Sequence, residues 1–281
     1  MSSSREFVNP DWSHCGSRYR LATCADQIGR ELGTRAQSGS AVVLCWVAWC
    51  VMVLELPVRR IDFGYFVRPA EETGTGQPRV EPCLGYVIAH PNGVVVVDTG
   101  MGSHPDVDAH YRPRRRPLVE ALATAGVSLA DVQCVVNCHL HFDHCGGNPQ
   151  LGGRPIFTQR VELEMARGPD YTLPELVDAP GLSYEVLDGE AEILRDVFVV
   201  PTPGHTAGHQ SVVVRRGDGT VIIAGQSHDT AAAFGGDLLA ARAAHDHHAD
   251  DLPSVPDWIE RLQAFDPRRV VFAHDGAVWE P

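Results

Sequence analysis

Four features of other protein classes are missing from this sequence of 281 residues: a positive net charge, a long apolar run, closely paired cysteines and a nucleophilic serine motif. The formal net charge of -13 opposes phosphate backbones and anionic membrane surfaces, which disfavours nucleic-acid and lipid binding. The apolar run at residues 41–54 is shorter than the ~20 residues that a membrane-spanning helix needs. The sequence therefore predicts a protein that acts on a small-molecule substrate, with no nucleic-acid partner and no membrane span.

The serine and cysteine patterns exclude two further kinds of site. No Gly-x-Ser-x-Gly motif is present, so the sequence offers no serine nucleophile at a strand-to-helix turn. The eight cysteines include no Cys-x-x-Cys pair and show no regular spacing, which indicates reduced thiols and not a disulfide framework. We therefore expect a cytoplasmic protein.

The N-terminal part differs in composition from the rest. Residues 1–40 show no sustained helical or strand period, and the apolar run after them lies too deep in the chain for an ordinary signal peptide. Met52 opens a stretch that alternates between apolar and polar residues, as the first strand of a domain does. We expect residues 1–51 to be a weakly structured extension that folding does not require, and residues 52–281 to form a single domain.

Alternation and apolar runs predict the elements of that domain. Residues 94–97 are continuously apolar, which is typical of a strand buried on both faces. Residues 169–180 contain three prolines and favour an irregular loop that could cover a substrate. Further strands are predicted at residues 58–67, 84–90, 132–136, 155–158, 191–200, 211–214, 220–224 and 269–273, and helices at residues 118–125, 161–167 and 256–265. This mixed order predicts two packed sheets covered by helices.

The densest group of chemically active residues follows the predicted strand 132–136. Within six positions stand three histidines and one aspartate: His139, His141, Asp143 and His144. Imidazole nitrogens and carboxylate oxygens are ligands for a borderline cation such as zinc, and crowding them is costly unless a cation compensates their desolvation. The cluster therefore predicts a metal site.

Other predicted strands also end in polar residues. Asp98 follows strand 94–97, where its carboxylate is expected to bond loop backbone or a ligand histidine, with a plain turn residue as the alternative. Residues of the same kind follow later strands: His205, Gln226, Asp229 and His274. Loops at strand ends are a common place for ligands on a rigid scaffold, so we expect these residues near the cluster. His209 comes too late after His205 to share its metal and is expected to support the loop.

Three features allow a plain structural interpretation beside a functional one. Cys145 directly follows the cluster and could approach a metal, but a small buried residue that fills space is favoured. The basic run at residues 112–117 is most often a solvated face, although it could attract an anionic group. The second His/Asp cluster at residues 245–251 could bind metal, but no strand precedes it, which favours an exposed cluster.

At these residues the sequence resembles the metallo-β-lactamase superfamily. The resemblance covers about residues 55–281 and lies in Asp98-Thr-Gly, the His-x-His-x-Asp-His motif at residues 139–144, Pro-Gly-His-Thr-x-Gly-His around His205, and His274 after the last strand. Residues 139–148, 202–211 and 272–275 are most similar to those of the N-acyl homoserine lactonases. The resemblance implies an α+β fold, an αββα four-layer sandwich with two packed mixed β-sheets flanked by helices.

The resemblance also implies the ligands and the reaction. It implies that one zinc is held by His139, His141 and His205, and a second zinc by Asp143, His144 and His274. A hydroxide between the metals would attack a lactone or ester carbonyl, so no Ser or Cys nucleophile is needed. Asp143 would be the catalytic residue that passes a proton to the leaving alkoxide, with pure ligation as its alternative.

Two positions depart from the lactonase pattern. Gln226 stands where the family has an aspartate that bridges both metals, so one negative charge is lost and the second zinc is expected to bind more weakly. His228 or Asp229 is a less favoured substitute ligand. Asp229 stands where the lactonases have a substrate-binding tyrosine, so Asp229 is a candidate substrate-binding residue and the preferred substrate could differ.

The sequence thus predicts a zinc-dependent hydrolase, with one or two zinc ions per chain, that opens a lactone or ester. N-acyl homoserine lactone is the leading substrate, and its hydrolysis is the quorum-quenching reaction. One alternative is a hydrolase of another ester, thioester or lactam on the same centre. Another is a degenerate metal-binding homologue with little turnover because of Gln226. A homodimer through a strand edge or the apolar run is a further hypothesis.

Overall fold

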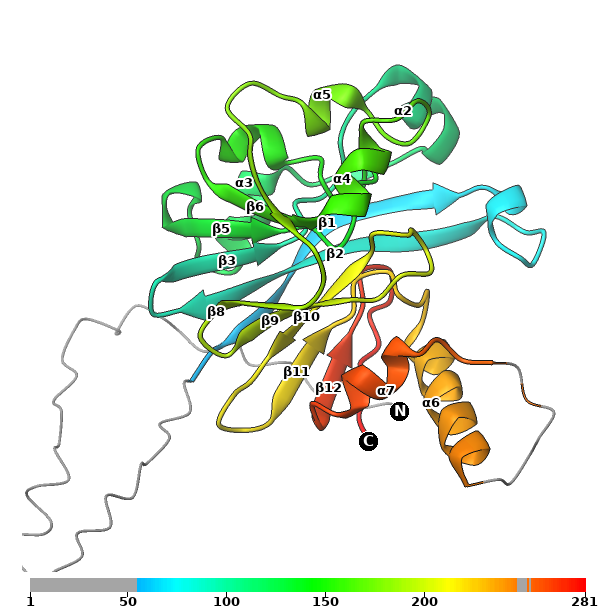
Figure 1. Ribbon diagram of the computed structural model, residues 1–281. Coiled ribbons are helices and arrows are strands. Elements are labelled where there is room, and N and C mark those ends of the chain that lie inside the picture. Colours follow the sequence, from blue (N-terminus) through cyan, green and yellow to red (C-terminus); the bar gives the residue numbers. More distant parts are fainter. Residues whose placement is uncertain (1–54, 247–251, 253) are drawn as a thin grey trace, which may run out of the picture. The chain divides into compact units, whose positions relative to one another are not determined.

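The computed structural model describes residues 55–246, 252 and 254–281, which all belong to one compact unit, Val53–Pro281 (Figure 1). The predicted extension, residues 1–51, lies outside the described residues, as does most of the second His/Asp cluster. Among the described helices, none combines the length and apolar character needed to cross a bilayer.

The first sheet has seven strands in the order β4-β1-β2-β3-β5-β6-β7. Neighbours from β4 through β3 pair antiparallel, whereas β3, β5, β6 and β7 run parallel. The strands are β1 (Val58–Arg68), β2 (Arg79–His90), β3 (Gly93–Val97), β4 (Arg114–Arg115), β5 (Val132–Val136), β6 (Pro155–Gln159) and β7 (Ser183–Leu187). The carboxyl ends of β3 and β5 therefore lie at the same edge of this sheet.

The second sheet has five strands in the order β12-β11-β10-β9-β8. Its neighbours pair antiparallel except for the parallel pair β11 and β12. The strands are β8 (Ala191–Leu194), β9 (Val197–Pro201), β10 (Gln210–Val214), β11 (Thr220–Ile223) and β12 (Pro267–Val271). Both sheets are mixed, as the family resemblance implied.

Helices lie on the outer face of each sheet (Figure 1). Those beside the first sheet are α2 (Pro105–Tyr111), α3 (Leu118–Thr124), α4 (Arg160–Ala166) and α5 (Pro174–Val177). Those beside the second are α6 (Ala231–His245) and α7 (Trp258–Gln263). Short 3-10 turns are η1 (Ala70–Glu72), η2 (Leu129–Asp131) and η3 (Asn148–Leu151). The predicted αββα sandwich is confirmed.

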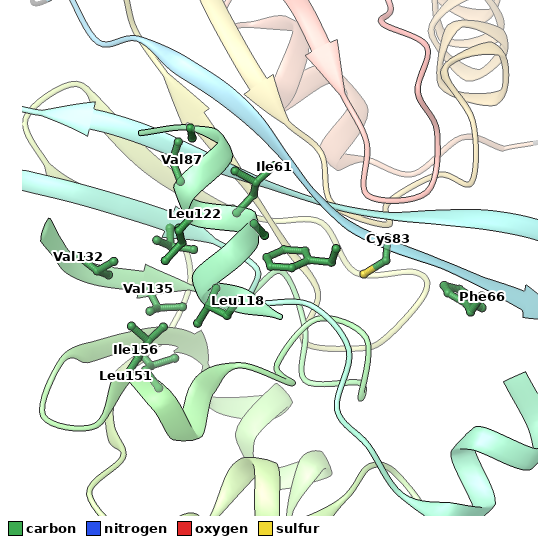
Figure 2. Packing of buried hydrophobic residues seen from close by; sticks show 14 residues of the cluster. Ile61, Phe66, Cys83, Val87, Leu118, Leu122, Val132, Val135, Leu151 and Ile156 are labelled. Carbon is green, nitrogen blue, oxygen red and sulfur yellow. The ribbon is translucent and has the colours of Figure 1, made fainter. Parts of the chain in front are cut away.

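Three apolar clusters hold these layers together. Between the sheets, Val95 and Val136 of the first pack with Val199 and Val212 of the second, all fully buried. On the outer face of the first sheet, Leu118 and Leu122 of α3 pack with residues of β1, β2 and β5 (Figure 2). On the outer face of the second sheet, helices α6 and α7 bury Phe234, Leu238, Ile259 and Leu262. Strand β3 contributes to two of these clusters, which explains its continuous apolar run.

Two predicted elements were wrong in detail. Residues 191–200 form the hairpin β8–β9 and not one strand, because Asp196 turns the chain at a φ of +65°, a conformation that Asp tolerates better than most residues. Residues 169–180 contain the short helix α5, which starts with Pro174 at the position where a missing N–H costs nothing. Helix α6 was not predicted. It begins at Ala231 and is capped by Thr230, whose side chain accepts a hydrogen bond from Ala233 N at 3.1 Å.

Candidate metal centre

The loop after β5 is fixed against the loop after β3 by backbone hydrogen bonds. Thr99 N donates to His144 O at 2.7 Å, and Gly146 N donates to Gly100 O at the same distance. A Cβ at Gly146 would lie 2.1 Å from Gly102 N, so only glycine fits this close approach. The histidine cluster is therefore held in one conformation by its neighbour loop.

Loops of the second sheet reach the same place. Gln210 N, at the start of β10, donates to Cys138 O at 2.8 Å, which links the loop after β9 to the loop after β5. Leu84 N of β2 donates to Ala273 O at 2.9 Å and ties the loop after β12 to the first sheet. His205 and His274 are thereby brought beside a cluster that is far away in the sequence.

The first group of facing ligand atoms belongs to His139, His141 and His205. His141 Nδ1 lies 3.0 Å from His139 Nε2 and 3.1 Å from His205 Nε2. His139 is fully buried, whereas His205 is exposed, so the group is closed on one side and open to solvent on the other. The aromatic ring of Tyr171 lies 4.7 Å from that of His141.

The second group belongs to Asp143, His144 and His274. The two imidazole Nε2 atoms are 3.2 Å apart, and Asp143 Oδ2 lies 3.3 Å from that of His274 and 3.7 Å from that of His144. All three side chains are buried. His139 also lies within reach of this group, because its ligand atom is within 4.8 Å of those of Asp143 and His144. The two groups are therefore adjacent.

Hydrogen bonds on the far side of two imidazole rings fix which nitrogen faces the centre. His144 Nδ1 lies 2.8 Å from Asp98 Oδ2, and His274 Nδ1 lies 2.9 Å from Pro82 O. Both partners are acceptors, so each Nδ1 carries a proton, and Nε2 is the nitrogen that would bind a metal ion. Asp98 Oδ1 also accepts from Cys138 N at 2.8 Å. Asp98 thus bonds both loop backbone and a histidine of the cluster.

The pKa values show that most of these imidazoles are neutral. Burial, together with the neighbouring imidazoles, lowers the pKa of His139 well below its usual value and that of His205 to about 3. Burial would also lower the pKa of His144, but the carboxylates of Asp98 and Asp143 raise it to about 9. Positive charge is therefore favoured at the second group, where His144 lies between two carboxylates.

The arrangement fits a metal ion better than hydrogen bonding. Two nitrogens bound to one tetrahedral zinc at about 2.0–2.1 Å lie about 3.3 Å apart, close to the separations within the first group. A single proton can form a hydrogen bond between only two of the three facing nitrogens of the first group, whereas a cation at their centre can bind all three. Histidine nitrogens with one carboxylate are a donor set that suits zinc.

Gln226 and His209 lie next to the second group. The side chain of Gln226 is buried and hydrogen bonds to that of His144, and its Nε2 has no partner. His209 Nε2 accepts a hydrogen bond from Gln226 N at 3.0 Å, while its Nδ1 faces Thr202. His209 therefore supports the loops and takes no place in either group.

Three other residues predicted near the site have separate partners. Asp229 is half-exposed and pairs with Arg79 at 2.8 Å. Burial would raise the pKa of Asp229, but the hydrogen bond from Arg79 and the charges of Arg68 and Arg79 together lower it. His228 Nε2 lies 3.1 Å from Asp237 Oδ2, and its ring packs against Trp258. Cys145 is fully buried, with its Sγ 3.4 Å from Leu140 O. None of these three contacts is with either group.

The basic run lies outside both groups. Arg114, Arg115 and Arg116 line a groove of about 910 Å³ with Arg60. Arg115 pairs with Asp108, and Arg116 pairs with Asp62 at 3.2 Å. Of the second His/Asp cluster, only His245 and Asp246 are described, and both are exposed.

Sequence reasoning missed Glu162 of α4. Its side chain is fully buried, and its carboxylate accepts hydrogen bonds from Leu140 N and the Thr206 hydroxyl, each at 2.7 Å. Glu162 stands beside Leu163, which is also buried, in the predicted helix 161–167. A charged residue on the apolar face of a short helix is the signal that could have identified it.

Curated relatives carry the same activity name. The chain is 32% identical over 146 residues to an N-acyl homoserine lactonase of Bacillus sp, a match that covers 47% of this chain and 58% of that protein. It is 31% identical over 165 residues to the N-acyl homoserine lactonase AttM of Rhizobium radiobacter, covering 50% and 63%. The chain thus spans only about three fifths of the length of these relatives.

Solved structures show the same fold. A structure of an N-acyl homoserine lactone hydrolase, with N-hexanoyl-L-homoserine at its catalytic metal centre, matches with a TM-score of 0.63. The match covers 80% of this chain and 95% of that chain at 24% identity. A quorum-quenching N-acyl homoserine lactone lactonase gives a TM-score of 0.62 with the same coverage and identity. The sequence model of one family matches residues 78–274, most of the chain, and on this ground the chain belongs to the metallo-beta-lactamase superfamily.

Proposed function

We propose that this protein is a zinc-dependent hydrolase that opens the ring of a lactone, with N-acyl homoserine lactone as the leading substrate. The observation that carries the proposal is the convergence of two adjacent groups of three ligand atoms at an open rim between the sheets. The likeness to curated N-acyl homoserine lactonases supports the choice of substrate.

The residues form two metal-binding sets, and Asp143 of the second set is also the proposed proton carrier. His139, His141 and His205 would hold one zinc, and Asp143, His144 and His274 a second. Bound zinc would polarise the substrate carbonyl and make water more acidic. Burial would raise the pKa of Asp143, but His144 and His274 lower it below its usual value, so the carboxylate is ionised at neutral pH.

An ionised Asp143 can carry a proton through the reaction. Water adds to the lactone carbonyl carbon, and Asp143 Oδ2 accepts the proton that the water gives up. The bond between that carbon and the ring oxygen then breaks, and Asp143 returns the proton to the leaving alkoxide. The products of ring opening are an alcohol and a carboxylic acid on the same molecule, and the acid releases its proton to water to become a carboxylate. The exposed side of His205 leaves room for the substrate to enter.

Ring opening of a lactone panel tests the proposal. Purified protein is incubated with N-acyl homoserine lactones of several chain lengths, simple lactones, esters, thioesters and lactams, and products are identified by mass spectrometry. We expect a mass gain of one water on the acyl homoserine lactones, at a rate well above that on the other classes. If another class of compound is hydrolysed faster, that class replaces N-acyl homoserine lactone as the proposed substrate. If no compound of the panel is hydrolysed, the proposal that the protein is a hydrolase is contradicted.

Gln226 favours a second candidate, a metal-binding homologue with little turnover. Its buried amide adds no negative charge beside His144, although the second group would face a dication. An amide is also a poorer ligand than a carboxylate. The second zinc is therefore proposed to bind more weakly than the first.

Replacing Gln226 with aspartate tests this role. We expect Gln226→Asp to raise the occupancy of the second metal and the rate of lactone opening together, because it adds a carboxylate beside the second group. Metal content by elemental analysis and initial rates are measured at several zinc concentrations. Gln226→Asn, which changes size without adding charge, is the control. A variant that raises neither quantity would refute this role of Gln226.

Several sequence predictions stay predictions. They are the cytoplasmic location, the homodimer, the dispensable extension at residues 1–51 and the role of Asp229 in substrate binding.

A further inference from the structure

The carboxylate of Glu162 connects three segments around the first group. Its Oε1 accepts hydrogen bonds from Leu140 N at 2.7 Å and from the hydroxyl of Tyr171, and its Oε2 accepts one from Thr206 Oγ1 at 2.7 Å. All three donors are neutral. Glu162 itself is fully buried in α4.

Burying a carboxylate is costly unless hydrogen bonds replace its water. Here both oxygens are used, which a carboxylate allows because it only accepts hydrogen bonds. Each hydrogen-bond donor to Glu162 is either adjacent in the chain to a histidine of the first group or in contact with one. Leu140 lies between His139 and His141 in the chain, and Thr206 directly follows His205.

The third hydrogen bond, from the Tyr171 hydroxyl, affects His141 through a contact between the two aromatic rings. The Tyr171 ring lies 4.7 Å from the His141 ring, so a tyrosine anchored on Glu162 restricts the orientation of that imidazole. The loop that carries His205 also packs directly on α4, because a Cβ at Gly208 would lie 2.3 Å from Glu162 N. Glu162 thus stands where the loop after β5 meets the loop after β9.

We propose that Glu162 is a positioning residue that sets the separation of His139 and His141 from His205, and so the affinity and geometry of the first metal site. The inference rests on the proposed metal centre. Glu162 differs from Asp98, which bonds an imidazole directly, because Glu162 acts on the backbone and side chains that carry the ligands. Its hydrogen bonds do not involve Asp143, His144 or His274, so its effect should be confined to the first site.

The test compares metal binding by Glu162→Gln and Thr206→Val with the wild-type protein. Glu162→Gln keeps the shape but replaces one accepting oxygen with a donor, and Thr206→Val removes only the bond toward His205. Glu164→Gln is the matched control, because Glu164 lies on the same helix and is exposed. Zinc affinity is measured by competition with a chromophoric chelator, and ligand geometry by the electronic absorption of the Co²⁺ form.

Glu162→Gln and Thr206→Val are expected to bind the first metal equivalent at least about tenfold more weakly and to change the Co²⁺ spectrum. The second equivalent and Glu164→Gln should match wild type. In the double variant the two losses should add less than fully, since Thr206→Val removes a contact that Glu162 itself makes. Unchanged affinity and an unchanged Co²⁺ spectrum in a folded variant would overturn the proposal.

Circular dichroism of the metal-free forms shows whether each variant folds. If Glu162→Gln does not fold, Thr206→Val decides the matter by the same two readouts. The lactone panel on wild-type protein is a separate result: absent hydrolysis with intact metal binding contradicts the proposed function and leaves the role of Glu162 standing.

Discussion

Replacing His139 with alanine is expected to empty the first metal site and to lower the rate of lactone opening by about a thousandfold or more. His139 is fully buried, and its ring lies 4.6 Å from that of His141 and 4.7 Å from that of His205. Metal ions contribute several kcal/mol to such reactions, and about 4 kcal/mol corresponds to a thousandfold in rate. Elemental analysis and initial rates on the best lactone measure the two effects.

His228→Ala is the matched control for this variant. His228 is also a histidine after a strand of the second sheet, but it contacts Asp237 and Trp258 and neither group. It should keep both metal content and rate. A His139→Ala protein that is folded, retains wild-type metal content and turns over lactone at the wild-type rate would refute the assignment of the first group.

Replacing Asp143 with asparagine is expected to lower kcat by about 10²- to 10⁴-fold, the range for loss of a general acid or base. The side chain is buried, and its Oδ2 lies 3.3 Å from His274 Nε2, so the same atom is placed to ligate and to move a proton. Asparagine keeps the shape but cannot accept and return a proton at neutral pH. The first group lacks Asp143 and should keep its metal.

Steady-state kinetics on one lactone, with metal content measured on the same sample, test this prediction. The control is Asp106→Asn, since the Asp106 side chain is 94% exposed. A fall in kcat that zinc excess restores would mean that Asp143 only ligates. A kcat equal to wild type would contradict both roles.

The buried strands could be predicted from sequence alone because they lie between two apolar layers. Strand β5 has the predicted bounds, Val132–Val136, and β3 differs from the prediction by one residue. Both strands have buried residues on each face, which leaves a continuous apolar run in β3 and, in β5, an apolar run interrupted only by the exposed Gln133. The histidines after β5 could be recognised as a site because imidazoles crowded beside a carboxylate need a cation to offset their desolvation.

Other parts depend on contacts that sequence spacing does not contain. Helix α6 has Gly235 and Gly236 in its interior, which weaken any helical pattern, and it is stabilised by packing of Phe234 and Leu238 on the second sheet. Glu162 bonds to Leu140 and Thr206, which are 22 and 44 positions away in the chain. The positions of His205 and His274 after predicted strands indicated that they lie near the cluster, but their assignment to one zinc or the other followed from family resemblance.

Zinc titration of the metal-free protein, with lactone opening and bound metal followed in the same samples, is the decisive test of a metal-dependent lactonase. We expect no ring opening without metal, a rise in rate that follows metal occupancy, and a second equivalent that binds more weakly than the first. Lactone opening at full rate in the metal-free protein would contradict metal-dependent hydrolysis.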